Sequence, residues 1–225
     1  MHMDMRVRDH ARARRRARLL GALLVVVGIL LAQATWAMCG MPLDDNNFKR
    51  PIDINDPNDD YEIRLVESGH ISADVLALRK GTSSYEPESD LHYTLRHIPN
   101  HYGALDAMGR WRLKHPRPLR PDFLSADCYY ERAFTFRPED PKLRVGYAIY
   151  LHRAKRYEDA RQQYIKAEEL GGDSAELFYN RGLLEVELGN IEIAKQYASK
   201  AYSLGYPLPG LRRKLDAAEA KAKKQ

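Results

Sequence analysis

The sequence predicts an all-α fold, a short α-solenoid in which helical hairpins stack on one another. Three observations support this prediction. Two consecutive stretches of about 34 residues share one pattern of small and large residues, which is typical of a repeat protein. The repeats leave few segments that could form strands. The chain ends in a charged stretch suited to a helix that covers the last hairpin, because each hairpin alone leaves an apolar face exposed.

The two copies of the repeat are residues 141–174 and residues 175–208, and small residues coincide when they are laid over one another. These pairs are Ala148 with Gly182, Ala160 with Ala194, and Ala167 with Ala201. Antiparallel helices approach closely only where neither carries a bulky side chain, so we expect these residues to mark helix crossings. Larger apolar residues then fill the space between hairpins.

The second copy resembles a tetratricopeptide repeat, and the first copy is similar to it. The matching residues are Phe178, Gly182, Gly189, Ala194 and Ala201 in the second copy and Ala148, Tyr157, Ala160, Tyr164 and Ala167 in the first. The family usually closes a repeat with proline, whereas these copies have Gly172 and Tyr206. The resemblance implies a right-handed solenoid and a role in binding other proteins.

A looser, tetratricopeptide-like unit is expected at residues 102–140. Gly109 takes the small position of its first helix, and residues 125–138 supply a second helix. The connector KHPRPLRPDF lies between these helices, and its prolines forbid one continuous helix.

Both ends of this array carry further helices in our prediction. Residues 65–101 are expected to form a divergent helical pair, roughly Val66 to Leu78 and Asp90 to Ile98. Residues 209–225 predict a capping helix with a charged outer face.

Residues 1–37 have the pattern of a signal peptide or a signal anchor. Seven arginines within residues 6–18 precede the apolar run LLGALLVVVGILLA and the small residues of AQATWA. Cleavage is expected after Ala37, with Ala34 as the second choice. Two alternatives stay open: retention as an anchor of about 20 mostly apolar residues, and a lipid-anchored form on Cys39. All three predict a periplasmic location for the repeats, the retained anchor holding them at the inner membrane.

The basic character of the chain belongs to this N-terminal segment. The formal net charge is +5, and residues 1–37 hold seven arginines against Asp4 and Asp9, so the remainder is formally neutral. A footprint for nucleic acid is therefore unsupported, and membrane contact is expected only through the N-terminal segment.

The chain has two cysteines, Cys39 and Cys128. An even number in an oxidising compartment predicts a disulfide between them. The alternative is a buried Cys128 beside a free Cys39.

Residues 38–64 are expected to be an irregular acidic linker. Its segment DINDPNDD offers carboxylates at alternating spacing, but it lacks the central glycine and terminal glutamate of a helix-loop-helix calcium site. A solvated, poorly ordered segment is the favoured interpretation.

The histidines do not make a metal or catalytic motif. His92, His97 and His101 lack the carboxylate of H-E-x-x-H, and His70 beside Glu67 lacks a nucleophile. We therefore predict no enzyme activity, no metal and no cofactor. A metal-dependent or hydrolytic module built on His70, Glu67 and His92 is the alternative.

A basic cluster around the connector is a possible docking patch for an acidic partner or lipid headgroups, against the alternative of a solvated loop. Its residues are Arg110, Trp111, Arg112 and Lys114.

The resemblance places the first helix of each hairpin on the concave side, where a partner segment would bind. The residues expected to face it are Val145, Ile149, His152, Arg153, Glu176, Tyr179, Asn180, Leu183 and Val186. Val145 and Ile149 replace the lysine and asparagine of the carboxylate-clamp subgroup, and part of the row could instead be core between repeats. The sequence thus favours a non-catalytic adaptor of the bacterial cell envelope, with a self-assembling subunit as a further alternative.

Overall fold

The computed structural model describes residue 39 and residues 50–222. The chain divides into two units, Met1–Met41 and Pro42–Gln225, and the helices described below belong to the second. This described part is built from helices without a strand, which confirms the predicted fold class. None of its helices combines the length and the apolar character needed to span a membrane. The expected signal peptide or anchor, residues 1–37, lies outside the described residues.

The helices follow one another along the chain, and most connections are short; residues 77–86 and 115–125 are the longer ones. After a 3-10 turn, η1 (Pro57–Asp59), they are α2 (Asp60–His70), α3 (Ala73–Leu76), α4 (Pro87–His97), α5 (Tyr102–Lys114), α6 (Ala126–Phe136), α7 (Pro141–Arg153), α8 (Tyr157–Glu169), α9 (Ala175–Glu187), α10 (Ile191–Ser203) and α11 (Gly210–Ala222).

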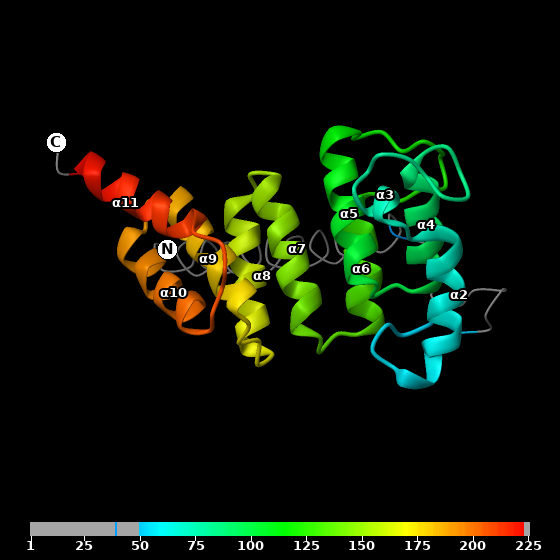
Figure 1. Cartoon of the computed structure of the whole chain (residues 1–225), viewed down its shortest axis with the longest axis horizontal. Helices are drawn as coiled ribbons and strands as arrows, with labels where there is room; N and C mark the ends of the chain where they lie inside the picture. The colour runs from blue at the N-terminus through cyan, green and yellow to red at the C-terminus, as the bar shows by residue number, and fades with distance from the viewer. Residues whose placement is uncertain (1–38, 40–49, 223–225) are drawn as a thin grey trace, which may run out of the picture. The chain divides into compact units, whose positions relative to one another are not determined.

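Three helical hairpins, α5 with α6, α7 with α8 and α9 with α10, form a solenoid like that of tetratricopeptide repeats (Figure 1). Their first helices pack side by side, α5 against α7 and α7 against α9. The second helix of each hairpin also contacts the first helix of the next one. Helix α11 closes the array by packing on both α9 and α10, as expected of a capping helix.

The repeat is visible in the backbone as well as in the sequence. Gly171 and Gly205, which follow α8 and α10, both have φ of 80°. Lys155 and Gly189, in the turns inside the two hairpins, have φ of 61° and 79°. Each pair is 34 positions apart, so the chain enters the left-handed region at the same two points of both copies. Glycine adopts this region without a steric penalty, whereas Lys155 does not.

The small residues lie at buried helix contacts, as the sequence predicts. Ala148, Ala160 and Ala194 are fully buried, and so are Ala167 and Ala201.

Gly182 requires one correction, because its tightest neighbour is not in its own hairpin. A Cβ atom at this position would lie 2.5 Å from Cδ2 of Leu211 on α11, and 3.4 Å from Cβ of Tyr197 on α10. The glycine therefore admits the capping helix more than it admits its hairpin partner.

The N-terminal pair differs from its prediction. The helix expected at Val66 to Leu78 is two helices, because α2 ends at His70 and Ser72 caps α3 by accepting a hydrogen bond from the N–H of Val75. The second helix of the pair starts earlier than predicted, at Pro87, a residue whose fixed φ suits the first turn of a helix.

The acidic segment from Asp53 to Asp60 buries two of its aspartates, Asp53 and Asp59, and α2 already begins at Asp60. The Asp59 carboxylate is fully buried and accepts hydrogen bonds from Arg50 and from the N–H of Asp53 at 2.8 Å. Ile52 packs with apolar residues of α2 and with Ile98. Over residues 50–64 the structure thus differs from the expected irregular linker, because guanidinium and amide partners compensate Asp53 and Asp59 and Ile52 anchors the segment; residues 38 and 40–49 lie outside the described residues.

The predicted disulfide is present: Cys39 and Cys128 are bonded to each other, and neither is a free thiol. Cys128 lies in α6 and is buried.

Candidate functional site

A groove of about 550 Å³ runs along the first helices of the three hairpins. Helices α5, α7 and α9 and the turn before α9 supply nearly all of its lining, and α6 adds one residue at the base. The lining residues are Tyr102, Leu105, Asp106, Tyr130, Pro141, Lys142, Leu143, Val145, Gly146, Ile149, Arg153, Gly171, Gly172, Asp173, Ser174, Glu176 and Leu177.

The floor of the groove is apolar. Leu105, Leu143 and Leu177 contribute buried aliphatic side chains from three different helices. Tyr130 of α6 lies beneath Gly146, where an added Cβ would be 3.5 Å from the phenolic oxygen. An apolar floor of this kind favours burial of an apolar ligand group.

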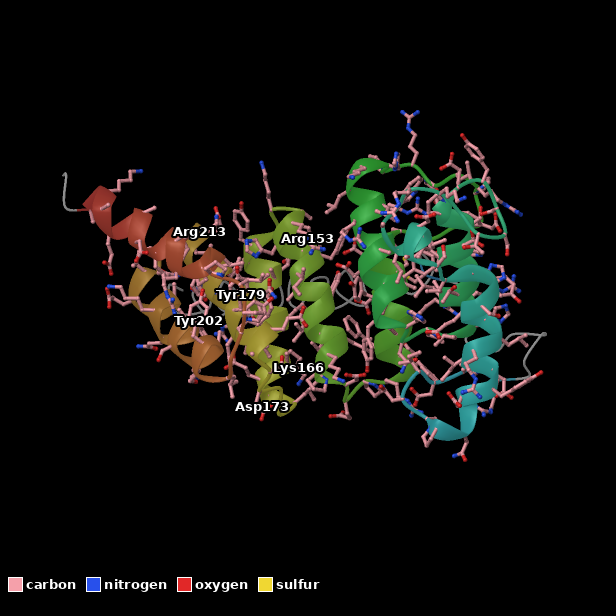
Figure 2. The ribbon with its side chains drawn as sticks, in the orientation of Figure 1. Arg153, Lys166, Asp173, Tyr179, Tyr202 and Arg213 are labelled. Carbon is pink, nitrogen blue, oxygen red and sulfur yellow. The ribbon has the colours of Figure 1, made fainter. Side chains whose placement is uncertain are left out.

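The rim carries charge. Asp106 accepts hydrogen bonds from Nη1 of Arg153 at 2.6 Å and from Nε of Arg110 at 2.8 Å. Burial alone would raise the pKa of Asp106, but these two guanidinium groups lower it below its ordinary value. Figure 2 shows Arg153 at the end of α7 and Asp173 ahead of α9.

Three further charged side chains lie on the rim. Within residues 50–222, Lys142, Asp173 and Glu176 form no ion pair, although all three line the groove. The ammonium of Lys142 instead lies 5.5 Å from the centre of the Tyr102 ring.

A second hollow of about 490 Å³ adjoins the groove and shares Tyr102, Pro141 and Lys142 with it. The Tyr102 hydroxyl donates to Asp140 at 2.6 Å and accepts a hydrogen bond from the Asn55 side chain at 2.7 Å. Burial, together with Asp140, raises the pKa of Tyr102. The shared wall makes the two hollows neighbouring parts of one surface.

Four of the nine residues expected to face a partner line the groove, namely Val145, Ile149, Arg153 and Glu176. His152 does not line it. Its ring is half-buried and meets the edge of Tyr157, with 5.7 Å between ring centres. Burial lowers the pKa of His152.

Three of the remaining residues lie under the capping helix. Tyr179 is 7% exposed and stacks on Tyr206 with 4.2 Å between ring centres. Leu183 and Val186 pack with the cluster that includes Leu211 of α11. Tyr179 is therefore buried in this cluster, and Leu183 and Val186 are partly buried against it.

Asn180, the last of the nine, is partly exposed. Its side chain donates to the backbone carbonyl of Glu176 at 2.9 Å, a contact within α9.

The basic cluster at the connector is mostly an internal brace, which corrects the idea of a docking patch. Trp111 donates from Nε1 to Glu88 at 3.0 Å, and the buried Arg112 pairs with the same carboxylate at 2.5 Å. Arg110 donates to the backbone carbonyl of Leu76 and to Asp106. Lys114 is exposed. No sequence pattern predicts this brace, because Glu88 lies far upstream in the chain.

The histidines have local partners. His70 does not pair with Glu67: its Nδ1 lies 2.8 Å from Asp90, and Glu67 instead meets His101 at 3.1 Å. His92 lies 2.7 Å from the Tyr129 hydroxyl, and burial lowers its pKa to about 4.

The serines near His70 do not form a nucleophile and base pair with it. Ser83 donates to the backbone carbonyl of Gly69, and Ser84 donates to the carbonyl of Glu86 and to Asp90. Over the described ranges, no group of three or more histidine, cysteine, aspartate or glutamate side chains is placed to hold a metal ion.

Comparison with known proteins adds support for the fold. No protein-family model matches the chain, and no curated protein matches it. Among solved structures, PilF of Pseudomonas aeruginosa, a tetratricopeptide-repeat protein, is similar with a TM-score of 0.50 and 20% sequence identity. The match covers 73% of this chain and 69% of that chain. At this identity the likeness shows the fold alone, a solenoid like that of tetratricopeptide repeats.

Proposed function

We propose that this protein is a non-catalytic interaction scaffold that holds a segment of a protein partner in the groove of α5, α7 and α9. The observation that carries the proposal is the groove itself, with its apolar floor and charged rim. Grooves between helices take extended or helical peptide segments through apolar anchors, and rim charges then orient the segment. The tetratricopeptide-like fold supports this class of function without naming a partner.

We further propose that the scaffold works in the bacterial cell envelope, after export to the periplasm. Two observations support this location: the signal-like pattern of residues 1–37, and the disulfide between Cys39 and Cys128. Disulfides persist in oxidising compartments. Retention of the N-terminal segment would hold the same groove at the periplasmic face of the inner membrane.

The groove favours binding over catalysis. Of the acids and phenols that line it, Asp106 is held by two arginines, and Tyr130 is kept neutral because burial raises its pKa. Neither group is poised as a general base near neutral pH, which an acid–base mechanism would require.

Site-specific photocrosslinking in living cells tests the scaffold. A photoreactive residue at Ile149 would lie inside the groove, and the matched control at Gln196 would lie on the exposed side of α10. We expect one envelope protein to be captured from Ile149 and not from Gln196, with mass spectrometry identifying the product.

Equal capture from both positions, or none from Ile149, would contradict the groove as the binding surface. Fractionation of the same cells tests the compartment. Recovery of the protein with the periplasm or membrane supports export, and recovery with the cytosol contradicts it.

A further inference from the structure

Building on the proposed function, we infer that the groove takes one apolar side chain of the partner segment over the Tyr130 hydroxyl, with a lysine or arginine of the same segment beside Glu176. The occupant is thus a polypeptide with an apolar anchor and an adjacent positive charge. Three features of the groove carry this inference.

The first feature is the hydroxyl of Tyr130. This side chain is 1% exposed and lines the groove, yet its oxygen has no hydrogen-bond partner among the described residues. The nearby Tyr147 does not satisfy it: the Tyr147 hydroxyl donates to Asp127 at 2.6 Å and makes no hydrogen bond with Tyr130. Buried polar groups in folded proteins are nearly always paired. The oxygen has almost no exposure in the free protein, so a bound segment would have to open the cover over it to offer a backbone carbonyl as the missing acceptor.

The second feature is the thin cover over that hydroxyl, at the place where the groove opens. Gly146 places no side chain over Tyr130, and a Cβ there would meet only Tyr130, at ordinary contact distances of 3.5 Å and more. Val145 and Ile149 of the same helix border the opening. The result is an apolar recess with a hydrogen-bonding group at its base, which fits an aromatic or branched aliphatic side chain and its own peptide group.

The third feature is the distribution of charge on the rim. Asp106 is already compensated by Arg110 and Arg153, whereas Asp173 and Glu176 pair with no residue of the described chain. The two open carboxylates lie together at the start of α9, which favours a positive group on the occupant and disfavours an anionic small molecule. Lys142, farther along the rim, is available to an acidic group or to the carbonyl end of the segment.

Fluorescence anisotropy with the full-length protein and labelled peptides tests the inference. The probe is the fluorescein-labelled, amidated peptide Gly-Lys-Phe-Gly-Gly, compared with Gly-Lys-Ala-Gly-Gly and Gly-Glu-Phe-Gly-Gly. We expect the alanine peptide to bind more than tenfold more weakly, because it lacks the apolar anchor. The glutamate peptide is expected to lose about three- to tenfold, because it places a negative charge beside Glu176.

Two substitutions test where on the protein the peptide binds. Gly146→Leu should abolish binding by filling the recess, whereas the control Gly69→Leu, a helical glycine whose added Cβ meets nothing within 4 Å, should leave it unchanged. Tyr130→Phe should weaken binding about three- to tenfold through the lost hydrogen bond. Its melting temperature should not fall, because the removed hydroxyl has no hydrogen-bond partner among the described residues.

Several outcomes overturn the inference. Equal binding of the lysine–phenylalanine and lysine–alanine peptides would contradict the proposed apolar anchor. Tighter binding of the glutamate peptide would contradict the proposed positive charge on the occupant. Unchanged peptide binding by Gly146→Leu would show that the peptide does not bind in the recess. A dimer of the full-length protein that dissociates in Gly146→Leu would identify a second copy as the occupant, which also overturns the proposal.

The experiment also separates this inference from the function on which it rests. If the partner is still captured from Ile149 in cells that carry Gly146→Leu, the proposed scaffold function stands and the proposed apolar anchor is contradicted. If the peptides bind in the expected order but no protein is captured from Ile149, the proposed recess stands and the proposed scaffold function is contradicted.

Discussion

Equivalent faces of two consecutive repeats differ in this protein, because one is open and the other is covered. On α7, Val145 borders an open groove, and Gly172 lies across from it in the turn before α9. The positions 34 residues further on carry Tyr179 and Tyr206, whose stacked rings fill the corresponding space beneath α11. The comparison shows that the repeat pattern fixes where a face lies, whereas the size of a few side chains and the next helix decide whether that face is open.

The largest effect is expected from giving α9 the residue that α7 carries at this position. Tyr179→Val removes the stack on Tyr206 and leaves a cavity under α11, so we expect a loss of about 3 kcal/mol in the free energy of unfolding. Urea denaturation of the full-length protein measures it. A loss below about 1 kcal/mol would mean that the rings do not hold α11, and the comparison would fail.

A smaller difference in stability is expected between substitutions at two helical glycines, one on each of these two faces. Gly182→Leu drives a side chain into Leu211, and we expect it to lower the free energy of unfolding by about 2 kcal/mol. Gly146→Leu points into the open groove and is expected to change stability by less than about 0.5 kcal/mol. Similar melting temperatures for the two variants would contradict the assignment of one face as covered and the other as open.

The smallest effect appears only on acidification and concerns His152, whose counterpart on α9 is Val186. Burial lowers the pKa of His152 below its ordinary value of 6.5 in the folded protein. As the pH falls through 6.5, the unfolded chain binds the proton first, so the folded state loses stability. His152→Val removes this contribution.

Melting curves between pH 7.5 and pH 5 check this expectation. The stability of the wild type relative to His152→Val should be highest above pH 6.5 and should decline below it. A difference that stays constant with pH would show that His152 titrates alike in the folded and unfolded chains.

The periodic part of the fold was predictable from sequence because its determinants are local. Small residues such as Ala160 and Ala194 recur at one spacing, and the helices α7 to α10 follow from them. The disulfide was predictable for a different reason, since a chain with two cysteines has one way to pair them with each other.

The N-terminal region was less predictable because its determinants are distant in the chain. Asn100 bonds the Asp53 carboxylate at 2.6 Å, which orders a segment that reads as a solvated linker. Glu88 likewise gathers Trp111, Arg112 and the N–H of Leu119, so a basic cluster becomes a brace. Such distant pairs leave no periodic pattern in the sequence.

The site was half predictable. Val145, Ile149, Arg153 and Glu176 follow from the position of the first helices, and they line the groove. Tyr130 was missed because it lies on a second helix, and its place beneath Gly146 becomes evident only when α6 and α7 are packed. A tyrosine set against a glycine of the following helix is a weak sequence signal that could have drawn attention to it.

The matching left-handed residues of the two repeats also determine how this protein can be lengthened. Because Gly171 and Gly205 end their helices in the same backbone conformation, a duplicate of residues 141–174 inserted after Ser174 would meet compatible junctions at both of its ends. An insertion after α10 would instead displace α11 from Leu183 and Tyr179. Gene duplication or engineering can therefore extend this array from within, and each inserted unit would add another candidate groove.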